Sequence, residues 1–197
     1  MYNLNFKKYS SPAFGKAEAL RYAGCREDDS YINELISACF NEVENQLEYK
    51  VCWLRLPLKI TDDISDFHLF SFKSKKLAAN LNSCNEAIVF AATTGIALDR
   101  LITKYSKLSP LKALLFQAIG AERIEALCDT FCEDIAHSLN CSTRPRFSPG
   151  YGDLELECQK KIFAVLDCER KLGLTLNQSL LMSPSKSVTA IMGINQN

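Results

Sequence analysis

Segment 146–153, RFSPGYGD, combines residue types that could bind a flat, charged small molecule. Pro149 fixes its own φ and favours an extended residue before it, while Gly150 lets a ligand approach the backbone closely. Arg146 offers a planar set of donors that matches a carboxylate, and Tyr151 offers a ring with a polar tip. We therefore interpret the segment as an extended binding strand, with an ordinary loop before a helix as the alternative.

The spacing of Arg146, Gly150 and Tyr151 resembles the S-adenosylmethionine-binding motif in the activation domain of cobalamin-dependent methionine synthase. Other segments resemble the free-standing form of that domain in the same order: LRYAG at 20–24, FAATTG at 90–95 with DRLI at 99–102, QAIGA at 117–121 with IEALCD at 124–129, and SPSKSVTAI at 183–191. The resemblance runs from about residue 17 to residue 194, so it is more specific than one short motif.

This resemblance implies a reactivation function in methionine biosynthesis. In the family, cobalamin that has oxidised to inactive cob(II)alamin is reduced by one electron and methylated by S-adenosylmethionine. The chain is thus expected to be the S-adenosylmethionine-binding activation subunit of a cobalamin-dependent methionine synthase, a methyltransferase. A partner methionine synthase chain is expected to carry the cobalamin, and a flavodoxin- or ferredoxin-like protein to donate the electron.

The resemblance also assigns the ligand site to six residues: Asp129, Arg146, Phe147, Ser148, Gly150 and Tyr151. Arg146 is expected on the methionyl carboxylate, and Asp129 near the amino or hydroxyl groups of the ligand. Backbone groups around Ser148 and Gly150 are expected to bind the adenine. Tyr151 is the expected catalytic residue, facing the corrin or shaping the methyl-donor pocket. The family's upstream acidic ligand contact has no clear equivalent in this sequence.

Two other functions are weighed against this one. A non-catalytic docking module or scaffold for a corrinoid protein is the main alternative, and the intact Arg146, Gly150 and Tyr151 argue against it. A free-standing small-molecule methyltransferase is expected to have a glycine-rich loop between a strand and a helix, which this sequence lacks. No phosphate-binding loop or nucleophile-elbow motif supports nucleotide or serine hydrolysis.

Composition indicates a globular chain without broad electrostatic surfaces. The 197 residues are 47% hydrophobic, which is enough to form a sizeable core. The 23 basic residues balance the 23 acidic ones without long blocks of either sign, so we expect no nucleic-acid or membrane partner. The longest apolar run, residues 87–92, is too short to span a bilayer, and residues 1–8 do not resemble a signal peptide. The expected location is the cytoplasm.

The cysteine pattern favours free thiols over a disulfide framework or a metal site. The nine cysteines include no C-x-x-C pair, and their number is odd. Cys128 and Cys132 are one helical turn apart, yet neither His68 nor His137 has a metal-ligand spacing to them. We therefore expect no metal site, and thiols kept reduced in the cytoplasm.

Hydrophobic periodicity predicts an α+β fold in which helices flank strands. Helices are expected at 16–22, 31–49, 74–81, 96–105, 110–137 and 153–172, and strands at 51–60, 67–72, 86–92 and 188–194. Strands 51–60 and 67–72 look like an antiparallel pair. The resemblance, rather than periodicity, implies a bent, mainly antiparallel sheet.

The predicted domain organisation is a loose N-terminal tail, residues 1–12, followed by one domain at 13–197. A two-lobed division at Ser109-Pro110 is the alternative. The long helix after this break carries Glu122, Glu125, Asp129 and Glu133 on one side. This side is expected to face solvent, except that the resemblance places Asp129 at the ligand.

Overall fold

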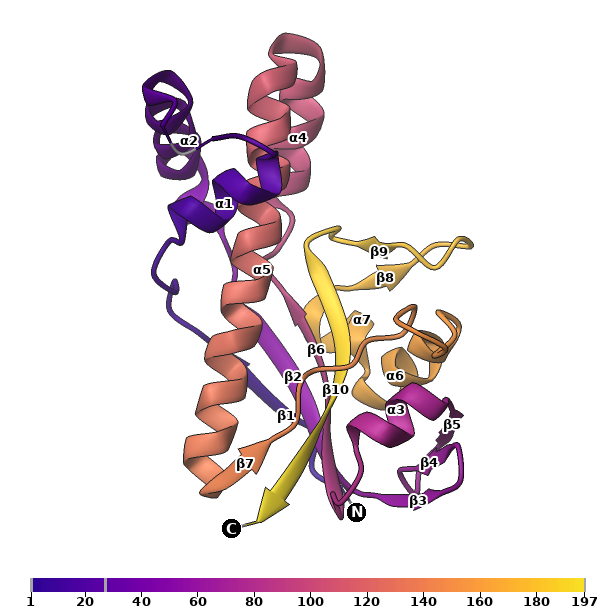
Figure 1. Cartoon of the computed structure of the whole chain (residues 1–197). Helices are drawn as coiled ribbons and strands as arrows, with labels where there is room; N and C mark the ends of the chain where they lie inside the picture. The colour runs from indigo at the N-terminus through magenta and orange to yellow at the C-terminus, as the bar shows by residue number, and fades with distance from the viewer. Residues whose placement is uncertain (1, 27, 197) are drawn as a thin grey trace.

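A computed structural model of the chain describes residues 2–26 and 28–196, and Figure 1 shows a curled sheet with helices around it. The main sheet has the strand order β1 (Asn5–Lys8), β2 (Lys50–Pro57), β6 (Glu86–Thr93), β10 (Ser187–Gln196) and β7 (Cys141–Thr143). All neighbouring strands in it are antiparallel. The predicted α+β class and the bent, mainly antiparallel sheet are confirmed.

Strand β6 is the centre of this sheet and is buried along almost its whole length. Its side chains alternate between the faces: Ile88 and Phe90 pack on one, while Val89 and Ala91 pack on the other. Because helices cover both faces, the strand has an unbroken apolar sequence instead of an alternating one.

Helix α5 (Pro110–Leu139) covers one face of the sheet. The Ser109 side chain accepts a hydrogen bond from the Lys112 N–H, and Pro110 occupies the first turn, as the predicted cap requires. The Phe131 ring packs against Phe90 with ring centroids 4.7 Å apart. This helix thereby fixes one wall of the site described below.

The other face is covered by shorter elements (Figure 1). They are α3 (Lys75–Asn80), α6 (Cys158–Leu166), α7 (Cys168–Leu172) and a small sheet of β3 (Lys59–Thr61), β4 (Ile64–Asp66) and β5 (Ser71–Lys73). A separate hairpin contains β8 (Thr175–Leu176) and β9 (Met182–Ser183).

A helical cluster extends beyond the sheet around the first half of α5 (Figure 1). It contains α1 (Lys16–Ala23), α2 (Ser30–Val43) with the 3-10 turn η1 (Glu44–Gln46), and α4 (Ala97–Leu108). Asp29 caps α2 as predicted, by accepting a hydrogen bond from the Ile32 N–H. The helix predicted as far as Tyr49 ends at Val43, because the backbone groups of residues 48 and 49 hydrogen-bond to Thr94 and Tyr9, next to the ends of β6 and β1.

The N-terminal segment is not a loose tail, and this prediction was wrong for residues 5–8. They form β1, paired with β2, and both Lys7 and the hydroxyl of Tyr9 donate to Asp134 of α5. Further along, Arg123 donates to the carbonyls of Pro12 and Ala13 at 2.7 Å. Backbone hydrogen bonds hold this edge strand, so its side chains can be polar. Its sequence therefore lacks the apolar pattern that predicts a strand.

Two strand and helix predictions were also wrong. Strand β2 pairs with β1 and β6 rather than with 67–72, because Pro57 ends it and the chain continues into the separate small sheet. The helix predicted at 153–172 is two helices, separated at Asp167, which has a φ of +49°. No helix within residues 2–26 and 28–196 has the length and apolar character needed to cross a membrane.

Candidate functional site

The candidate site lies where the segment after β7 passes over α5. Arg146 donates from Nη1 to Asp129 Oδ1 at 2.5 Å and from Nη2 to Glu125 Oε2 at 2.8 Å. Asp129 and Glu125 lie four residues apart on α5, so their carboxylates share one side of the helix. The structure thus brings together two residues assigned to the ligand, Asp129 and Arg146.

A surface depression of about 510 Å³ surrounds this ion pair; its lining residues are Asp129, Cys132, Thr143, Arg144, Pro145, Arg146 and Met192. The Arg146 side chain is 24% exposed, whereas Asp129 and Glu125 are 64% and 47% exposed. Both carboxylates can therefore move away into water at low cost, while the guanidinium stays in place.

Arg146 keeps unused hydrogen-bonding capacity. Its third recorded hydrogen bond runs from Nη1 to Cys132 Sγ at 3.8 Å. A guanidinium has five N–H groups, so Nε–H and one Nη2–H have no partner among the residues that the structure describes. They are available to an incoming carboxylate.

Arg146 is the permanent charge of the site. Burial opposes its charge, but the hydrogen bond to Asp129 raises the pKa of its guanidinium above the ordinary value. Burial also raises the pKa of the Cys132 thiol, against the influence of Arg146, and that of Cys128. Both thiols are neutral near pH 7, so charge at the site comes from Arg146 and the two carboxylates.

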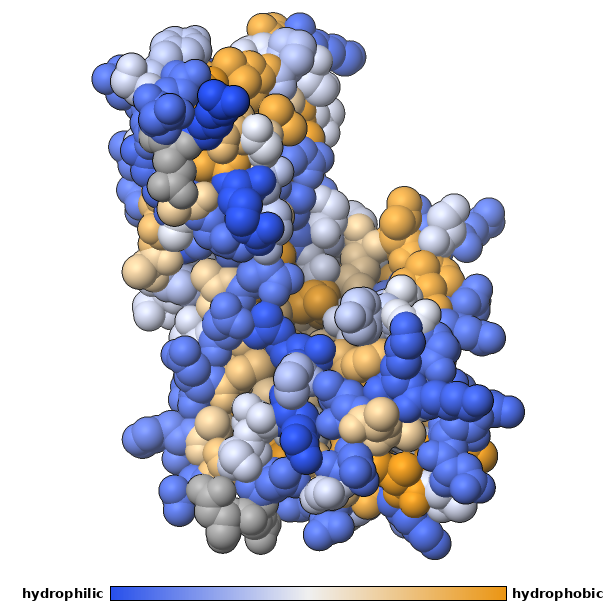
Figure 2. All heavy atoms as spheres, in the orientation of Figure 1, coloured by the Kyte–Doolittle hydropathy of each residue, from blue (hydrophilic) through white to orange (hydrophobic). Residues whose placement is uncertain are grey.

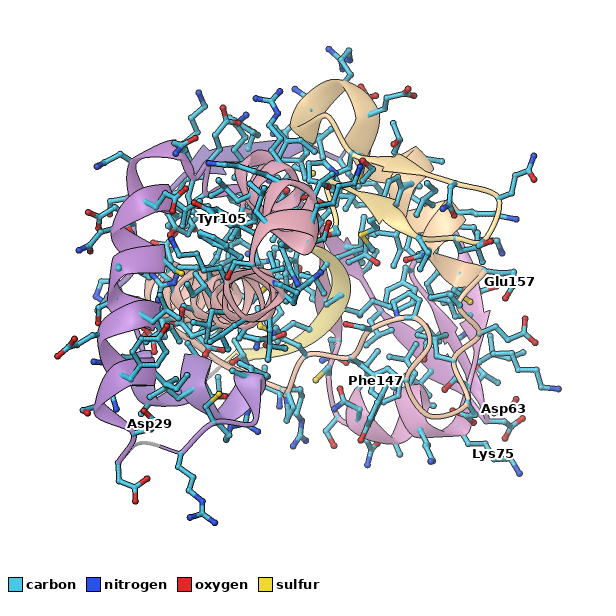
Figure 3. All side chains as sticks on the ribbon, turned by 90° about the horizontal axis from the view of Figure 1, so that it is seen from above. Asp29, Asp63, Lys75, Tyr105, Phe147 and Glu157 are labelled. Atoms are coloured by element: carbon cyan, nitrogen blue, oxygen red, sulfur yellow. The ribbon has the colours of Figure 1, made fainter. Side chains whose placement is uncertain are left out.

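Phe147 anchors the loop. Its N–H and its carbonyl both bond to Ile191 of β10 at 2.9 Å, and the residue is 4% exposed. Seen from above, Phe147 lies on the side of Asp63 and Lys75, away from the helical cluster (Figure 3). Its backbone groups and its ring are all engaged within the protein, so it positions the turn that follows it.

The extended part of the predicted binding strand ends at Phe147, and a tight turn follows. Gly150 has a φ of +87°, and its N–H bonds to the Leu154 carbonyl at 2.8 Å. The Tyr151 N–H bonds back to the Ser148 carbonyl at 3.1 Å. Within the described chain, the Ser148 N–H and the Gly150 carbonyl have no partner. The free Ser148 donor thus lies just before Pro149, and the free Gly150 acceptor lies just after it.

Asp153 fastens this turn to α3 instead of beginning a helix of its own, which corrects the sequence prediction. Its carboxylate accepts hydrogen bonds from Ser74 Oγ at 2.5 Å, from the Lys75 N–H at 2.8 Å and from the Lys76 N–H at 3.2 Å. The hydrogen bond from Ser74 holds the pKa of Asp153 below its usual value. The turn is therefore tied at both ends, to β10 and to α3.

Tyr151 projects from this turn into solvent. Its side chain is 66% exposed, and its ring packs edge-on against Phe147 with ring centroids 5.2 Å apart. It does not line the depression around Arg146. The structure therefore places Arg146 and Asp129 in one depression, and Ser148, Gly150 and Tyr151 on the adjoining turn.

Sequence reasoning did not single out Glu125 as a site residue. The available signal was its position one helical turn before Asp129, which puts both carboxylates on the same side of the helix. The contact with Arg146 also requires the loop after β7 to cross α5 at this point, and the sequence does not reveal that crossing. Among residues 2–26 and 28–196, no group of three or more His, Cys, Asp or Glu residues could hold a metal ion, at this site or at any other.

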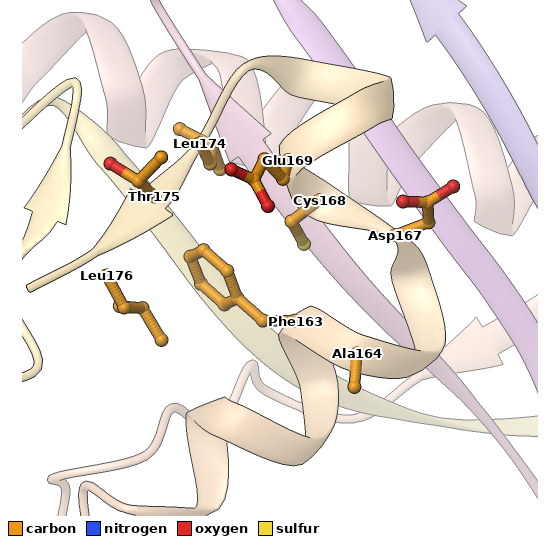
Figure 4. Close-up of a pocket in the computed structure, with 8 residues that line it drawn as sticks. All are labelled: Phe163, Ala164, Asp167, Cys168, Glu169, Leu174, Thr175 and Leu176. Carbon is orange, nitrogen blue, oxygen red and sulfur yellow. The ribbon is translucent and has the colours of Figure 1, made fainter.

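A second hollow of about 320 Å³ lies between α6, α7 and β8 and is lined by Phe163, Ala164, Asp167, Cys168, Glu169, Leu174, Thr175 and Leu176 (Figure 4). The neighbouring Cys52 thiol, together with burial, raises the pKa of the Cys168 thiol. The hollow carries two carboxylates and no lysine or arginine. It therefore lacks the cation that an anionic ligand group needs, which the Arg146 depression provides.

Comparison with solved structures gives several matches. One of them is a crystal structure of the MetH reactivation domain bound to AdoHcy, with a TM-score of 0.72 at 14% identity, covering 97% of this chain and 78% of that one. The chain has the reactivation-domain fold. No family model and no curated protein sequence matches it. At this identity the match establishes the fold, and function has to be argued from the site.

Proposed function

We propose that the chain binds S-adenosylmethionine at Arg146 and the adjoining turn, as the methyl-donor subunit for reductive methylation of cob(II)alamin in a cobalamin-dependent methionine synthase. The observation that carries this proposal is the half-buried Arg146, with two unused N–H groups. The same fold is found in the MetH reactivation domain, whose crystal structure contains AdoHcy.

The chemistry of the site fits this ligand. Arg146 is suited to the methionyl carboxylate, and the freed carboxylate of Asp129 to the ammonium group. Adenine presents a ring nitrogen acceptor beside an amino donor. The Ser148 N–H and the Gly150 carbonyl are a matching donor and acceptor. Backbone groups held by a tied turn are pre-ordered, which lowers the entropic cost of binding.

The proposed partner is a cobalamin-carrying methionine synthase chain, and a flavodoxin- or ferredoxin-like protein is the proposed electron donor, all in the cytoplasm. The bound corrinoid supplies the methyl-accepting cobalt. The contribution of this chain is to hold the sulfonium methyl in line with the acceptor while excluding water. Tyr151, exposed beside the turn, is the proposed residue at the reacting interface.

Surface shape supports a docking partner. The space-filling view shows a hollow between the helical cluster and the β8–β9 hairpin, with exposed hydrophobic atoms (Figure 2). Exposed apolar residues of the chain include Ile96 just before α4, Leu114 of α5 and Leu181 just before β9. Apolar residues grouped on a concave surface are typical of protein interaction sites.

Titration calorimetry with S-adenosylmethionine tests the proposal, with and without the cobalamin-carrying partner. We expect binding by the wild type and a loss of about 1.5 to 3 kcal/mol in Arg146→Ala, because a charged hydrogen bond is removed. Arg170→Ala, which changes an exposed arginine paired with Asp167, serves as the control.

Two results would contradict the proposal. Unchanged affinity in Arg146→Ala removes this residue from the site. The absence of any binding by the wild type, even with the partner present, favours the non-catalytic scaffold, for which the closed pairing of Arg146 with two carboxylates is the supporting observation.

A further inference from the structure

We infer that Glu125 makes the site selective for the sulfonium ligand over its thioether product, S-adenosylhomocysteine. This inference rests on the proposed function and adds a specificity-determining residue to it. It starts from the ion pairs of Arg146, which faces two carboxylates rather than one.

The groups around Arg146 carry a net charge of −1. Arg146 contributes one positive charge, and Glu125 and Asp129 contribute two negative ones, while the neighbouring Cys132 thiol is neutral. Glu133 is exposed one helical turn beyond Asp129 and does not contact Arg146.

Arg144 does not neutralise this excess, although it lines the same depression. Its Nη2 donates to the Asn82 carbonyl at 3.0 Å, and its Cγ lies against Gly193. Gly193 faces away from α5, because its neighbours Met192 and Ile194 pack on the α5 side of the sheet. The guanidinium of Arg144 is therefore held at the Asn82 carbonyl, on the side of the sheet away from α5.

Methyl transfer changes the charge that this site encounters. The bond between the methyl carbon and sulfur breaks and its electron pair stays on sulfur, so the sulfonium becomes a neutral thioether, while the methyl carbon bonds to the reduced corrinoid of the partner, which supplies the electron pair of the new bond. The net charge of the ligand falls from +1 to 0, while its carboxylate, ammonium and adenosine groups are unchanged. A site with excess negative charge therefore attracts the donor more strongly than the product.

The ratio of the two affinities isolates the role of Glu125. Glu125 also competes with the ligand carboxylate for Nη2 of Arg146, but this competition is the same for both ligands and cancels in the ratio. What remains is its attraction to the sulfonium. For charges about 7 Å apart at a partly exposed site, this corresponds to about a three- to thirtyfold preference at low salt.

The test measures dissociation constants of S-adenosylmethionine and S-adenosylhomocysteine by calorimetry, with the partner present if binding requires it. We expect the wild type to prefer S-adenosylmethionine. Glu125→Gln should lower this preference about three- to thirtyfold, with unchanged or tighter product binding. Glu133→Gln, which removes a charge from the same helix without touching Arg146, should change the ratio less than about twofold. Raising the salt concentration should reduce the wild-type preference.

The outcomes separate this inference from the proposed function. If Glu125→Gln and the wild type bind both ligands with the same ratio, the inference is wrong while the site stands. An equal weakening of both ligands in Glu125→Gln also overturns it, because it would make Glu125 a purely structural partner of Arg146. If the wild type binds neither ligand under any condition, the proposed function fails and the inference fails with it.

Discussion

Arg123 and Arg146 both have carboxylate partners, and burial distinguishes their roles. Arg123 is fully buried, pairs with the buried Glu122 and lies over the rings of Phe14 and Phe40. Arg146 instead pairs with exposed carboxylates that water can solvate. Breaking a buried pair strands a charge in the core, whereas an exposed pair exchanges partners at small cost. Arg146 is therefore suited to binding a ligand, and Arg123 to holding the N-terminal segment in place.

The hydroxyl of Tyr151 provides a test at the residue scale. No hydrogen bond is recorded for it within the described chain, and the ring contact with Phe147 does not require it. Tyr151→Phe should leave the free energy of unfolding within about 0.5 kcal/mol of wild type, and the affinity for S-adenosylmethionine within about twofold. It should slow methyl transfer about tenfold, as expected for one lost hydrogen bond at the reacting interface. An unchanged methylation rate, followed by methylcobalamin absorbance, would limit Tyr151 to packing.

The residue types of the site could be predicted from sequence, but not all of their partners. The spacing of Arg146, Gly150 and Tyr151 identified the loop, and the resemblance added Asp129. The burial of Phe147 could not be predicted, because only the bridge to Ile191 shows that its ring turns into the core. Glu122 was expected in solvent and is buried, since its carboxylate accepts a hydrogen bond from the Gly15 N–H at 2.9 Å. Such contacts join segments more than 40 residues apart, which local patterns do not reveal.

At the scale of elements, helix α5 and the loop before β10 cross at Gly120. The Lys186 side chain lies across this glycine and donates from Nζ to Gln117 Oε1 at 2.6 Å. A Cβ at position 120 would lie 2.6 to 2.8 Å from three carbons of Lys186. Burial lowers the pKa of Lys186, and Asp99 opposes this effect. The glycine is thus a site of close approach between segments 117–121 and 183–191.

The effect of Gly120→Ala on the free energy of unfolding tests this contact, because it should change sign when the Lys186 side chain is removed. Gly120→Ala alone should lower the free energy of unfolding by about 1 to 3 kcal/mol, because Lys186 has to move. In a Lys186→Ala background, the same substitution should raise it by about 0.5 to 1 kcal/mol, since alanine favours the helix over glycine. Chemical denaturation of the four proteins measures both effects. Equal effects in the two backgrounds would contradict the proposed contact.

The link between Asp153 and α3 provides a pH-dependent test. The pKa of Asp153 is lowered in the folded state, so its stabilising effect is present above the unfolded pKa near 4 and is lost as pH falls through the folded value. Asp153→Asn should lower the thermal midpoint at pH 7, and the difference from wild type should shrink as pH drops below about 4. Glu155→Gln, an exposed neighbour, is the control. A difference that persists unchanged at low pH would contradict this role.

Elements with strong local signals were predictable, and those defined by distant pairing were not. The apolar run of β6 and the Ser109-Pro110 start of α5 predicted the bounds of both elements nearly correctly. Strand β1 and the pairing of β2 were missed, because a strand's partner depends on the sheet order and not on its own sequence. The bent sheet followed from the resemblance alone.

At the scale of the whole molecule, α5 connects the helical cluster to the sheet. Its first half packs Leu115, Phe116 and Ile119 into the helical cluster, and its second half packs Leu127 and Phe131 onto the sheet. The Arg146 site lies on this second half, and the hollow of Figure 2 adjoins the helical cluster. One rigid helix thus relates the ligand site to the proposed docking surface, an arrangement suited to presenting a small ligand to a large partner.

The central claim is that this chain supplies the methyl donor for cobalamin reactivation. The most direct measurement is the anaerobic formation of methylcobalamin, followed by absorbance, on a methionine synthase fragment in the cob(II)alamin state with a low-potential electron donor. We predict that methylcobalamin forms only when this chain, S-adenosylmethionine and the electron donor are all present, and that Arg146→Ala slows its formation at limiting S-adenosylmethionine. Methylcobalamin that forms equally fast when the chain is omitted would contradict the claim.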